Sequence, residues 1–395
     1  MGDTEPLRVV DFSTHMSGPL ASHLLMELGA DVVKVEHPVQ GDGNRGNEPR
    51  LKGVSDMHLG LNTGARSIAV STRSPHWPDV VAALAGWSDA VIVGSRPKDA
   101  MRRGLDFATL LQANPELVYC VVSGFGLAGP WSDYKAHGQT MDAMAGRVEV
   151  DWHDGQPQTR VGWRSAGTSL AGVFGAMGVL AAIVKRDRGG GPQFVHTSIW
   201  NSAMWWNWRD LNTWANNDEQ WHEYKTLGSR YSMYATSDER ALLVCPLEQV
   251  FWQRFCDLTG LEHLRDRGEW THSMDFGYDD ETPQIAEAVA KRSLEEWTRL
   301  LDQAEIPFAP ILTLEEALNS EHAGVNRVMR GTQVPHGEAR LAASPVQVSG
   351  SPEEAALPDL PDVSPPPDLG ADSEDILREV GLDRLVGEDI SAGLR

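Results

Sequence analysis

The chain has 395 residues, of which 41% are hydrophobic and 23% charged. This composition excludes a disordered or fibrous protein, and the length favours two domains. A formal net charge of −22 excludes nucleic acid and an anionic membrane as partners, because an acidic field repels phosphate. Any anionic ligand therefore needs a local cluster of cations.

The cysteines and the N-terminus indicate the compartment. Cys120, Cys245 and Cys256 form no CxxC pair and leave one cysteine over, which is typical of reduced thiols. We therefore expect neither a disulfide framework nor a metal site. No basic region followed by an apolar stretch opens the chain, so we predict no signal peptide and a cytoplasmic protein.

The first forty residues read as a βαβ unit. Apolar runs predict strands over Arg8–Phe12 and Asp31–Glu36, and helical spacing predicts a helix over Pro19–Leu28. Gly18 stands where that helix would begin and Gly29 where it would end.

The same alternation continues along the chain. Strands are predicted at Ser67–Val70, Ala90–Val93 and Leu117–Val122, with helices near Val80–Ala85 and Phe107–Leu111. This order indicates a parallel sheet covered by helices on both faces. No GxGxxG motif follows the first strand, so a standard dinucleotide site is not expected.

The apolar segment Ser165–Val184 has the length of a membrane span. It is rich in alanine and glycine rather than leucine and phenylalanine. Gly172, Gly175 and Gly178 recur every three residues, which favours a core helix packed closely against backbone.

The second half predicts a smaller unit and an arm. A Trp- and Asn-rich stretch over 200–221 leads to a mixed unit with a strand at Ala241–Val244 and helices near Val250–Leu258 and Leu294–Ala304. A Pro-rich arm, Ser344–Asp368, precedes a helix at Ser373–Val380 with Asp372 or Ser373 as its N-cap. We predict a large domain over 1–215, a small domain over 229–323, and an arm with a final helix over 324–395.

Six segments in order resemble the family III acyl-CoA transferases of the CaiB/BaiF type, which include formyl-CoA transferase and α-methylacyl-CoA racemase. Together they span nearly the whole chain. They are Val10–Glu36 with Gly41-Asp42 and Arg45-Gly46; Asn62–Ser67; Asn114-Pro115; Ser123–Pro130; Gly178–Ser198; and Glu296–Leu318.

The resemblance implies an α/β fold: a Rossmann-like large domain built from both chain ends and a smaller α+β domain. It also implies an interlocked dimer. The substrates implied are an acyl-CoA and a carboxylic acid, with coenzyme A as acyl carrier.

Coenzyme A needs cations for its phosphates. The cluster around Arg96 and Arg102 is the strongest basic patch of this acidic chain, and it lies where the family has a phosphate-contacting arginine. His37 takes the place of a basic residue after the "KVE" strand. His15 and Met16 lie in the first loop, with Met16 replacing a glutamine found near the active site of formyl-CoA transferases.

Two positions would carry the chemistry. His137 matches a histidine that acts as a base in the racemase branch, and imidazole titrates near neutrality. Thr168 occupies the place of the aspartate that transferases use as nucleophile and racemases as base. A hydroxyl is a poor nucleophile without an adjacent base, and Asp151 and Asp154 lie too far upstream to replace the aspartate.

Three readings stay open. The chain is a CoA transferase with an atypical site, or the non-catalytic subunit of a heteromer with a paralogous chain, or a racemase, isomerase or lyase that uses His137. The tryptophans 205, 206, 208 and 214 are typical either of an apolar ligand site or of a subunit interface.

Overall fold

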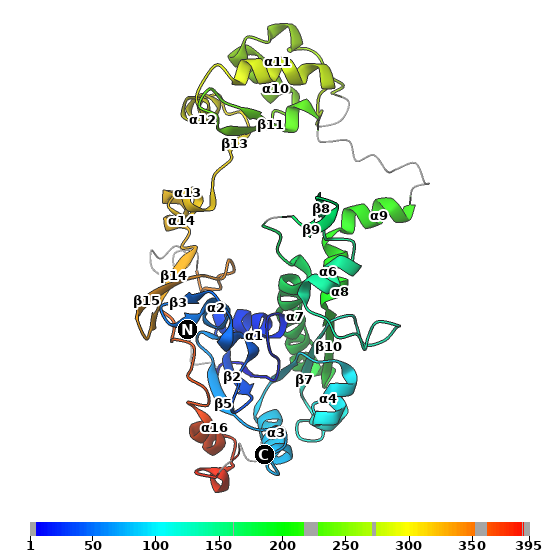
Figure 1. Ribbon diagram of the computed structural model, residues 1–395, viewed down its shortest axis with the longest axis vertical. Coiled ribbons are helices and arrows are strands. Elements are labelled where there is room, and N and C mark those ends of the chain that lie inside the picture. Colours follow the sequence, from blue (N-terminus) through cyan, green and yellow to red (C-terminus); the bar gives the residue numbers. More distant parts are fainter. Residues whose placement is uncertain are drawn as a thin grey trace. The chain divides into compact units, whose positions relative to one another are not determined.

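The structure is a computed structural model that describes residues 5–160, 162–216, 228–270, 274–351, 362–388 and 390. The chain divides into two compact units. Unit 1 comprises Met1–Ala215 and Gly324–Arg395, and unit 2 comprises Asn216–Ala323 (Figure 1). Each unit is described by itself. Trp221, part of the predicted Trp-rich stretch, and 352–361 of the predicted arm lie outside the described residues.

Unit 1 is built on a six-stranded sheet in the order β10-β7-β6-β1-β2-β5, and every neighbouring pair in it is parallel. Both faces of the strands β1, β2, β6 and β7 are buried, which explains their largely apolar sequences. The strands are β1 (Arg8–Asp11), β2 (Asp31–Glu36), β5 (Arg66–Ala69), β6 (Ala90–Val93), β7 (Val118–Ser123) and β10 (Gln193–Ser198).

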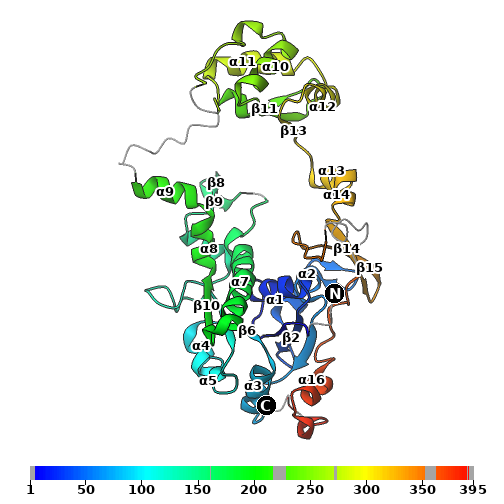
Figure 2. The same ribbon diagram turned by 180° about the vertical axis from the view of Figure 1, so that it is seen from behind.

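Helices cover both faces of this sheet. Val10, Val91 and Val121 point to the core beneath α3 (Trp77–Trp87), α5 (Phe107–Leu111) and α16 (Ser373–Glu379). Val9 and Ile92 point to the other core, beneath α1 (Ser17–Glu27) and α7 (Ala166–Lys185). Figure 2 shows α7 lying along α1. The α/β class predicted from the alternating pattern is confirmed.

Shorter elements complete unit 1 and the segments that join it to unit 2. The helices are α2 (Asp56–Asn62), α4 (Pro97–Arg103), α6 (Gly138–Met144), α8 (Ile199–Trp206), α9 (Trp208–Asn216) and α14 (Glu321–Val325). The hairpin strands are β3 (Arg50–Leu51), β4 (Val54–Ser55), β8 (Val150–His153), β9 (Gln156–Thr159), β14 (Met329–Val334) and β15 (Gly337–Ala342).

The apolar helix is packed through its glycines. Among the described residues, Ala166–Gly190 is the one helical stretch long and apolar enough to cross a membrane, with mean hydropathy 1.9. A Cβ on Gly172 would lie 2.8 Å from Leu20 Cβ, and one on Gly178 would lie 2.5 Å from Val195 Cγ1. The glycine spacing therefore serves the close packing that the sequence predicts.

Unit 2 is a small antiparallel sheet covered by helices. Its buried centre includes Trp252, Phe255 and Trp297, and the buried Arg230 pairs with Glu281 at 2.7 Å. The strands run in the order β11 (Ser232–Ala235), β12 (Ala241–Val244) and β13 (Phe308–Pro310). The helices are α10 (Gln249–Thr259), α11 (Thr282–Val289), α12 (Leu294–Gln303) and α13 (Leu314–Leu318).

Asp372 occupies the N-cap position of α16, as the sequence predicts. Its side chain makes no cap hydrogen bond, however; its Oδ2 accepts from the backbone N–H of Ser67 at 2.8 Å. Ser373 accepts from Ala69 N at 3.2 Å. Both side chains dock the arm on the edge strand β5, whose outer N–H groups need acceptors.

Candidate active site at the crevice of the parallel sheet

The sheet has one topological switch point. From β1 the chain adds β2 and β5 on one side, while β6, β7 and β10 lie on the other. Loops after β1 and β6 therefore open a crevice at the carboxyl ends of the strands, where such sheets bind ligands. A Cβ on Gly18 would lie 2.1 Å from Ser13 Oγ, and one on Gly94 would lie 2.7 Å from Ser13 Cβ. These glycines let the first loop enter the crevice.

The buried Lys34 supports the first loop, which joins β1 to α1. Lys34 Nζ lies 2.9 Å from Oδ2 of both Asp11 and Asp42, and donates to the carbonyl of Ser13 at 2.7 Å. Burial acts to lower the pKa of Lys34, but the two carboxylates outweigh it and raise that pKa above its ordinary value. Lys34 therefore stays charged and fixes the loop.

His15 stands at the tip of this loop in a left-handed conformation, with φ of 69°. Non-glycine residues rarely adopt it, and strain of this kind is concentrated at functional sites. The N–H of His15 donates to Asp42 Oδ1 at 3.2 Å, and its carbonyl accepts from Asn44 Nδ2. A Cβ on Gly43 would lie 2.6 Å from the His15 ring. The "GD..RG" segment thus holds an exposed imidazole in place.

The second half of that segment fastens the C-terminal arm. Arg45 binds Glu36 through two hydrogen bonds, of 2.7 and 2.6 Å, and donates to the carbonyl of Pro367 at 3.0 Å. Ser67 Oγ donates to the same glutamate at 2.6 Å and accepts from Gly370 N at 2.9 Å. Burial acts to raise the pKa of Glu36, but Arg45 and Ser67 hold it below its ordinary value.

His137 comes to the first loop from the opposite side of the crevice. It is the residue before α6, and its exposed ring lies edge-on to that of His15, with centroids 6.1 Å apart and planes at 87°. Two of the predicted site residues, 122 positions apart in the chain, are therefore neighbours.

Thr168 lies in the first turn of α7, beside α6. Its Oγ1 is 2.5 Å from Ser165 Oγ, and its carbonyl accepts from Ser17 Oγ at 2.9 Å. A Cβ on Gly138 would lie 2.3 Å from Thr168 Oγ1. Since Gly138 follows His137 directly and Ser17 follows Met16, the predicted residues Met16, His137 and Thr168 converge.

The sequence prediction missed Asp142, a carboxylate at this same place. Asp142 is fully buried; its Oδ1 accepts from Gly167 N at 3.1 Å, and its Oδ2 accepts from Ser165 Oγ. Asp151 belongs to the β8–β9 hairpin, where it pairs with Arg160. In the structure Asp142 and Met141 are the buried residues of the short helix α6.

The predicted CoA-side cations are placed as follows. Arg96 and Arg102 both bind the carboxylate of Asp99, at 2.6 and 2.9 Å. Burial acts to raise the pKa of Asp99, but the guanidinium groups of Arg96 and Arg102 hold it below its ordinary value. The patch therefore keeps only part of its charge for a ligand. His37 caps a turn instead, because its Nδ1 accepts from the N–H groups of Val39 and Gln40, both at 3.2 Å.

Cysteine and metal chemistry find no support in the described parts of the chain. Those residues contain no group of three or more His, Cys, Asp or Glu arranged to hold a metal ion. Burial raises the pKa of Cys120 and Cys256 to about 12 and also raises that of Cys245. A thiolate nucleophile is therefore disfavoured at all three.

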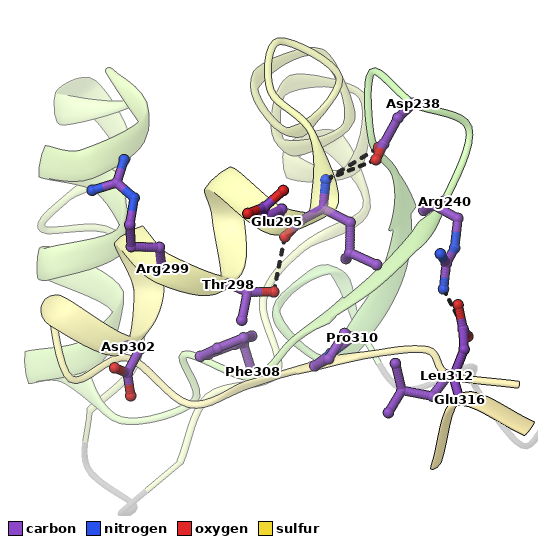
Figure 3. A pocket seen from close by; sticks show the side chains of 11 residues that line it. Asp238, Arg240, Glu295, Thr298, Arg299, Asp302, Phe308, Pro310, Leu312 and Glu316 are labelled. Atoms are coloured by element: carbon purple, nitrogen blue, oxygen red, sulfur yellow. Dashed lines mark hydrogen bonds and ion pairs between the residues drawn. The ribbon is translucent and has the colours of Figure 1, made fainter. Parts of the chain in front are cut away.

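A cavity of about 710 Å³ opens within unit 2 (Figure 3). Its lining contains four carboxylates and two guanidinium groups, and one of these guanidinium groups, that of Arg240, is paired with Glu316 at 3.0 Å. The excess of negative charge disfavours the phosphates of coenzyme A. None of the predicted site residues lines this cavity.

Known proteins similar to this chain give the fold and the site a context. An acetyl-CoA:oxalate CoA-transferase of Acetobacter aceti is 24% identical over 367 residues, which cover 91% of this chain and 92% of that protein. A formyl-CoA:oxalate CoA-transferase of Streptomyces avermitilis is 28% identical over 410 residues, covering 96% and 95%.

Solved structures share the fold. The Mycobacterium tuberculosis protein Rv3272 superposes with a TM-score of 0.77 at 23% identity, over 95% of this chain and 99% of that one. A CaiB/BaiF family protein from Brucella suis gives 0.73 at 20% identity, over 95% and 98%. The model of CoA-transferase family III matches residues 5–373. With the sheet, the crevice and this match in agreement, the chain belongs to CoA-transferase family III.

Proposed function

We propose that this protein transfers coenzyme A from an acyl-CoA to a carboxylic acid, in the crevice formed by His15, His137 and Thr168. The observation that carries the proposal is the convergence of these residues at the switch point, in a chain of this family. The similar transferases act on acyl-CoA and oxalate by name, which supports an acyl-CoA and an acid as the substrate classes.

A threonine at position 168 requires a transfer route without an enzyme-bound anhydride. The acceptor carboxylate attacks the thioester carbon of the bound acyl-CoA, the C–S bond breaks, and CoA thiolate leaves. The anhydride of the two acids stays in the crevice. The thiolate then attacks the acceptor-derived carbonyl and displaces the donor acid. Each bond formed is matched by one broken, and the site contributes mainly proximity and orientation.

The basic patch at the N-cap of α4 and in its last turn supports a site for the coenzyme phosphates. Arg96 and Arg102 contact the phosphates of coenzyme A after releasing part of their interaction with Asp99. His15 and Met16 border the thioester end of the crevice. No metal takes part in this scheme.

We further propose that the protein is cytoplasmic and works as a dimer, either of two identical chains or with a paralogous subunit. The outer side of α7 leaves Val173, Met177, Leu180 and Val184 between 38% and 58% exposed. Their spacing of four, three and four residues puts them on one face of the helix. An apolar face of this kind is typical of a subunit interface.

The test is turnover by the purified chain with pairs of acyl-CoA and carboxylic acid. Formation of the new acyl-CoA, followed by chromatography, would support the transferase. Activity that appears only on adding a paralogous subunit would identify a non-catalytic chain. Uptake of solvent deuterium at the acyl α-carbon, lost in His137→Ala, would instead identify an isomerase.

A further inference from the structure

Three side chains link the buried end of α6 to the first turn of α7. Ser165 Oγ donates to Asp142 Oδ2, and the same oxygen lies 2.5 Å from Thr168 Oγ1. An ionised carboxylate only accepts hydrogen bonds, and a serine hydroxyl has one proton to give. The Ser165 proton therefore goes to Asp142, so the Thr168 proton goes to Ser165.

This direction determines what Thr168 presents to a ligand. With its proton engaged by Ser165, Oγ1 offers lone pairs, as a carboxylate oxygen at the same position would. Asp142 does not offer them, because it is fully buried and binds both Gly167 N and Ser165. The Ser165 oxygen is occupied as well, since it also accepts from Thr168 N at 3.2 Å. Thr168, itself 6% exposed, is the end of this chain of hydrogen bonds opposite Asp142.

We propose that Thr168 Oγ1 attacks the thioester carbon of a bound acyl-CoA, so that the protein also hydrolyses acyl-CoA through an acyl-threonine ester. This inference rests on the acyl-CoA binding proposed above. Asp142 is a positioning residue that acts through Ser165. The N-terminus of α7, a helix of 20 residues, favours the negative charge that develops on the carbonyl oxygen.

Acylation proceeds as follows. Oγ1 forms a bond to the thioester carbon while its proton moves to Ser165 Oγ and the Ser165 proton moves to Asp142 Oδ2. The C–S bond breaks, and CoA leaves as the thiolate. The proton returns from Asp142 along Ser165 to the departing sulfur, so the products are the threonine ester and CoA–SH.

Deacylation consumes one water molecule. Water adds to the ester carbon and loses a proton, the bond to Oγ1 breaks, and Oγ1 takes up a proton. The products are the free acid and the original hydroxyl. No oxidant, reductant or further co-reactant is required.

The same three side chains also cap α7, so the test must separate capping from catalysis. In Asp142→Asn the amide oxygen still accepts from Gly167 N, but the NH₂ group donates to Ser165 instead of accepting from it. That variant keeps the cap and reverses the direction of the hydrogen bonds. Ser169→Ala is the matched control, because Ser169 Oγ lies in the same turn but bonds only the Ser165 carbonyl, at 3.5 Å.

The experiment incubates the full chain with acetyl-CoA or hexanoyl-CoA in the absence of an acceptor acid. Loss of thioester absorbance reports hydrolysis, and intact-protein mass reports the acyl adduct. We expect an adduct on the peptide that contains Thr168, absent in Thr168→Ala and retained in Thr168→Ser. Asp142→Asn should slow acylation by about 100-fold or more with little change in KM, the range for loss of general base assistance. Ser169→Ala should behave as the unaltered chain.

Hydrolysis by Asp142→Asn at the unaltered rate, or an adduct on another residue, would overturn the inference. Calorimetry with the same acyl-CoA distinguishes failure of this inference from failure of the proposed function. If acyl-CoA binds and CoA passes to an acid without hydrolysis or adduct, only the acyl-threonine is wrong. If no acyl-CoA binds, the proposed function has failed.

Discussion

Gly138 lies so close to Thr168 that a Cβ at position 138 would stand 2.3 Å from the threonine hydroxyl oxygen. No change of backbone conformation is needed for alanine there, because Gly138 has no positive φ. The methyl group would press mainly on the Thr168 hydroxyl and would also lie 3.3 Å from Ser165 Oγ.

Gly138→Ala should therefore displace Thr168 Oγ1 and reduce Thr168-dependent hydrolysis, at a cost in stability of about 1 to 3 kcal/mol from overpacking. Gly60→Ala is the control, because its Cβ would meet nothing within 4 Å. Rates of thioester loss and urea unfolding of both variants make the comparison. Equal hydrolysis by Gly138→Ala and the unaltered chain would show that this hydroxyl does not matter.

Thr168→Asp should be destabilising while Asp142 is present. The two carboxylates would flank Ser165 about 5 Å apart, and like charges at that distance repel by about 3 kcal/mol at an effective dielectric constant near 20. Asp142→Asn in the same chain should remove most of this penalty. A double-mutant cycle measured by urea unfolding tests the coupling, and additive effects would contradict it.

Arg96→Ala with Arg102→Ala should weaken binding of coenzyme A. Each charged hydrogen bond contributes about 1.5 to 3 kcal/mol, and the competition from Asp99 puts the expected loss at the lower end. Asp99→Asn should act in the opposite direction by releasing both guanidinium groups. Isothermal titration with coenzyme A measures both, and an unchanged affinity in the double alanine variant removes the assignment.

Stability should fall in mild acid because of His23. Burial, with the nearby charge of Arg330, lowers the pKa of His23 from 6.5 to about 4. Between these values the unfolded chain binds more protons than the folded one, so the free energy of unfolding decreases as pH falls through this window. Through this shift the free energy of unfolding is about 3 kcal/mol lower below pH 4 than above pH 6.5.

Urea unfolding from pH 7.5 to 4.5 checks this expectation. His23→Gln removes one of the titrating groups and should reduce the pH dependence; part should remain, because burial also lowers the pKa of His58 to about 4. His76→Gln, at a half-exposed histidine, is the control. A pH profile of His23→Gln that parallels the unaltered chain would rule out His23 as the cause.

Light scattering should report a dimer at micromolar concentration. Met177→Asp puts a charge into the middle of the apolar face of α7 and should weaken the association. Val39→Asp, at a side chain 67% exposed elsewhere in unit 1, should not. A monomer of the unaltered chain at this concentration would count against the dimer.

The sequence predicted the fold because its signals are local. Alternating apolar runs and helix-end glycines such as Gly29 depend on neighbours within a few residues. The observed bounds of β1, β2 and β6 therefore agree closely with the predicted ranges. Helix ends were less exact: α1 begins at Ser17 rather than at Pro19, since a proline without N–H is tolerated throughout the first turn.

The site was harder to predict because its partners are distant in sequence. Lys34 reads as a charge within a strand, and its burial against Asp42 emerges only when the loop folds over it. Asp142 was passed over because no local pattern shows that α6 packs against α7. By contrast, the spacing of Arg96, Asp99 and Arg102 by three residues does predict shared pairing on one helix.

The docking of the C-terminal arm has a consequence for synthesis. Pro367 and Gly370 complete the support of the first loop, because the carbonyl of Pro367 accepts from Arg45 and the N–H of Gly370 donates to Ser67. Both residues are made more than three hundred positions after the loop itself. A nascent chain can form β1, β2 and β5 early, but Ile376 and Leu377 must still enter the core. The crevice that holds His15 is therefore completed only after residues 367–377 have been made, and a chain stopped before residue 362 would lack this support.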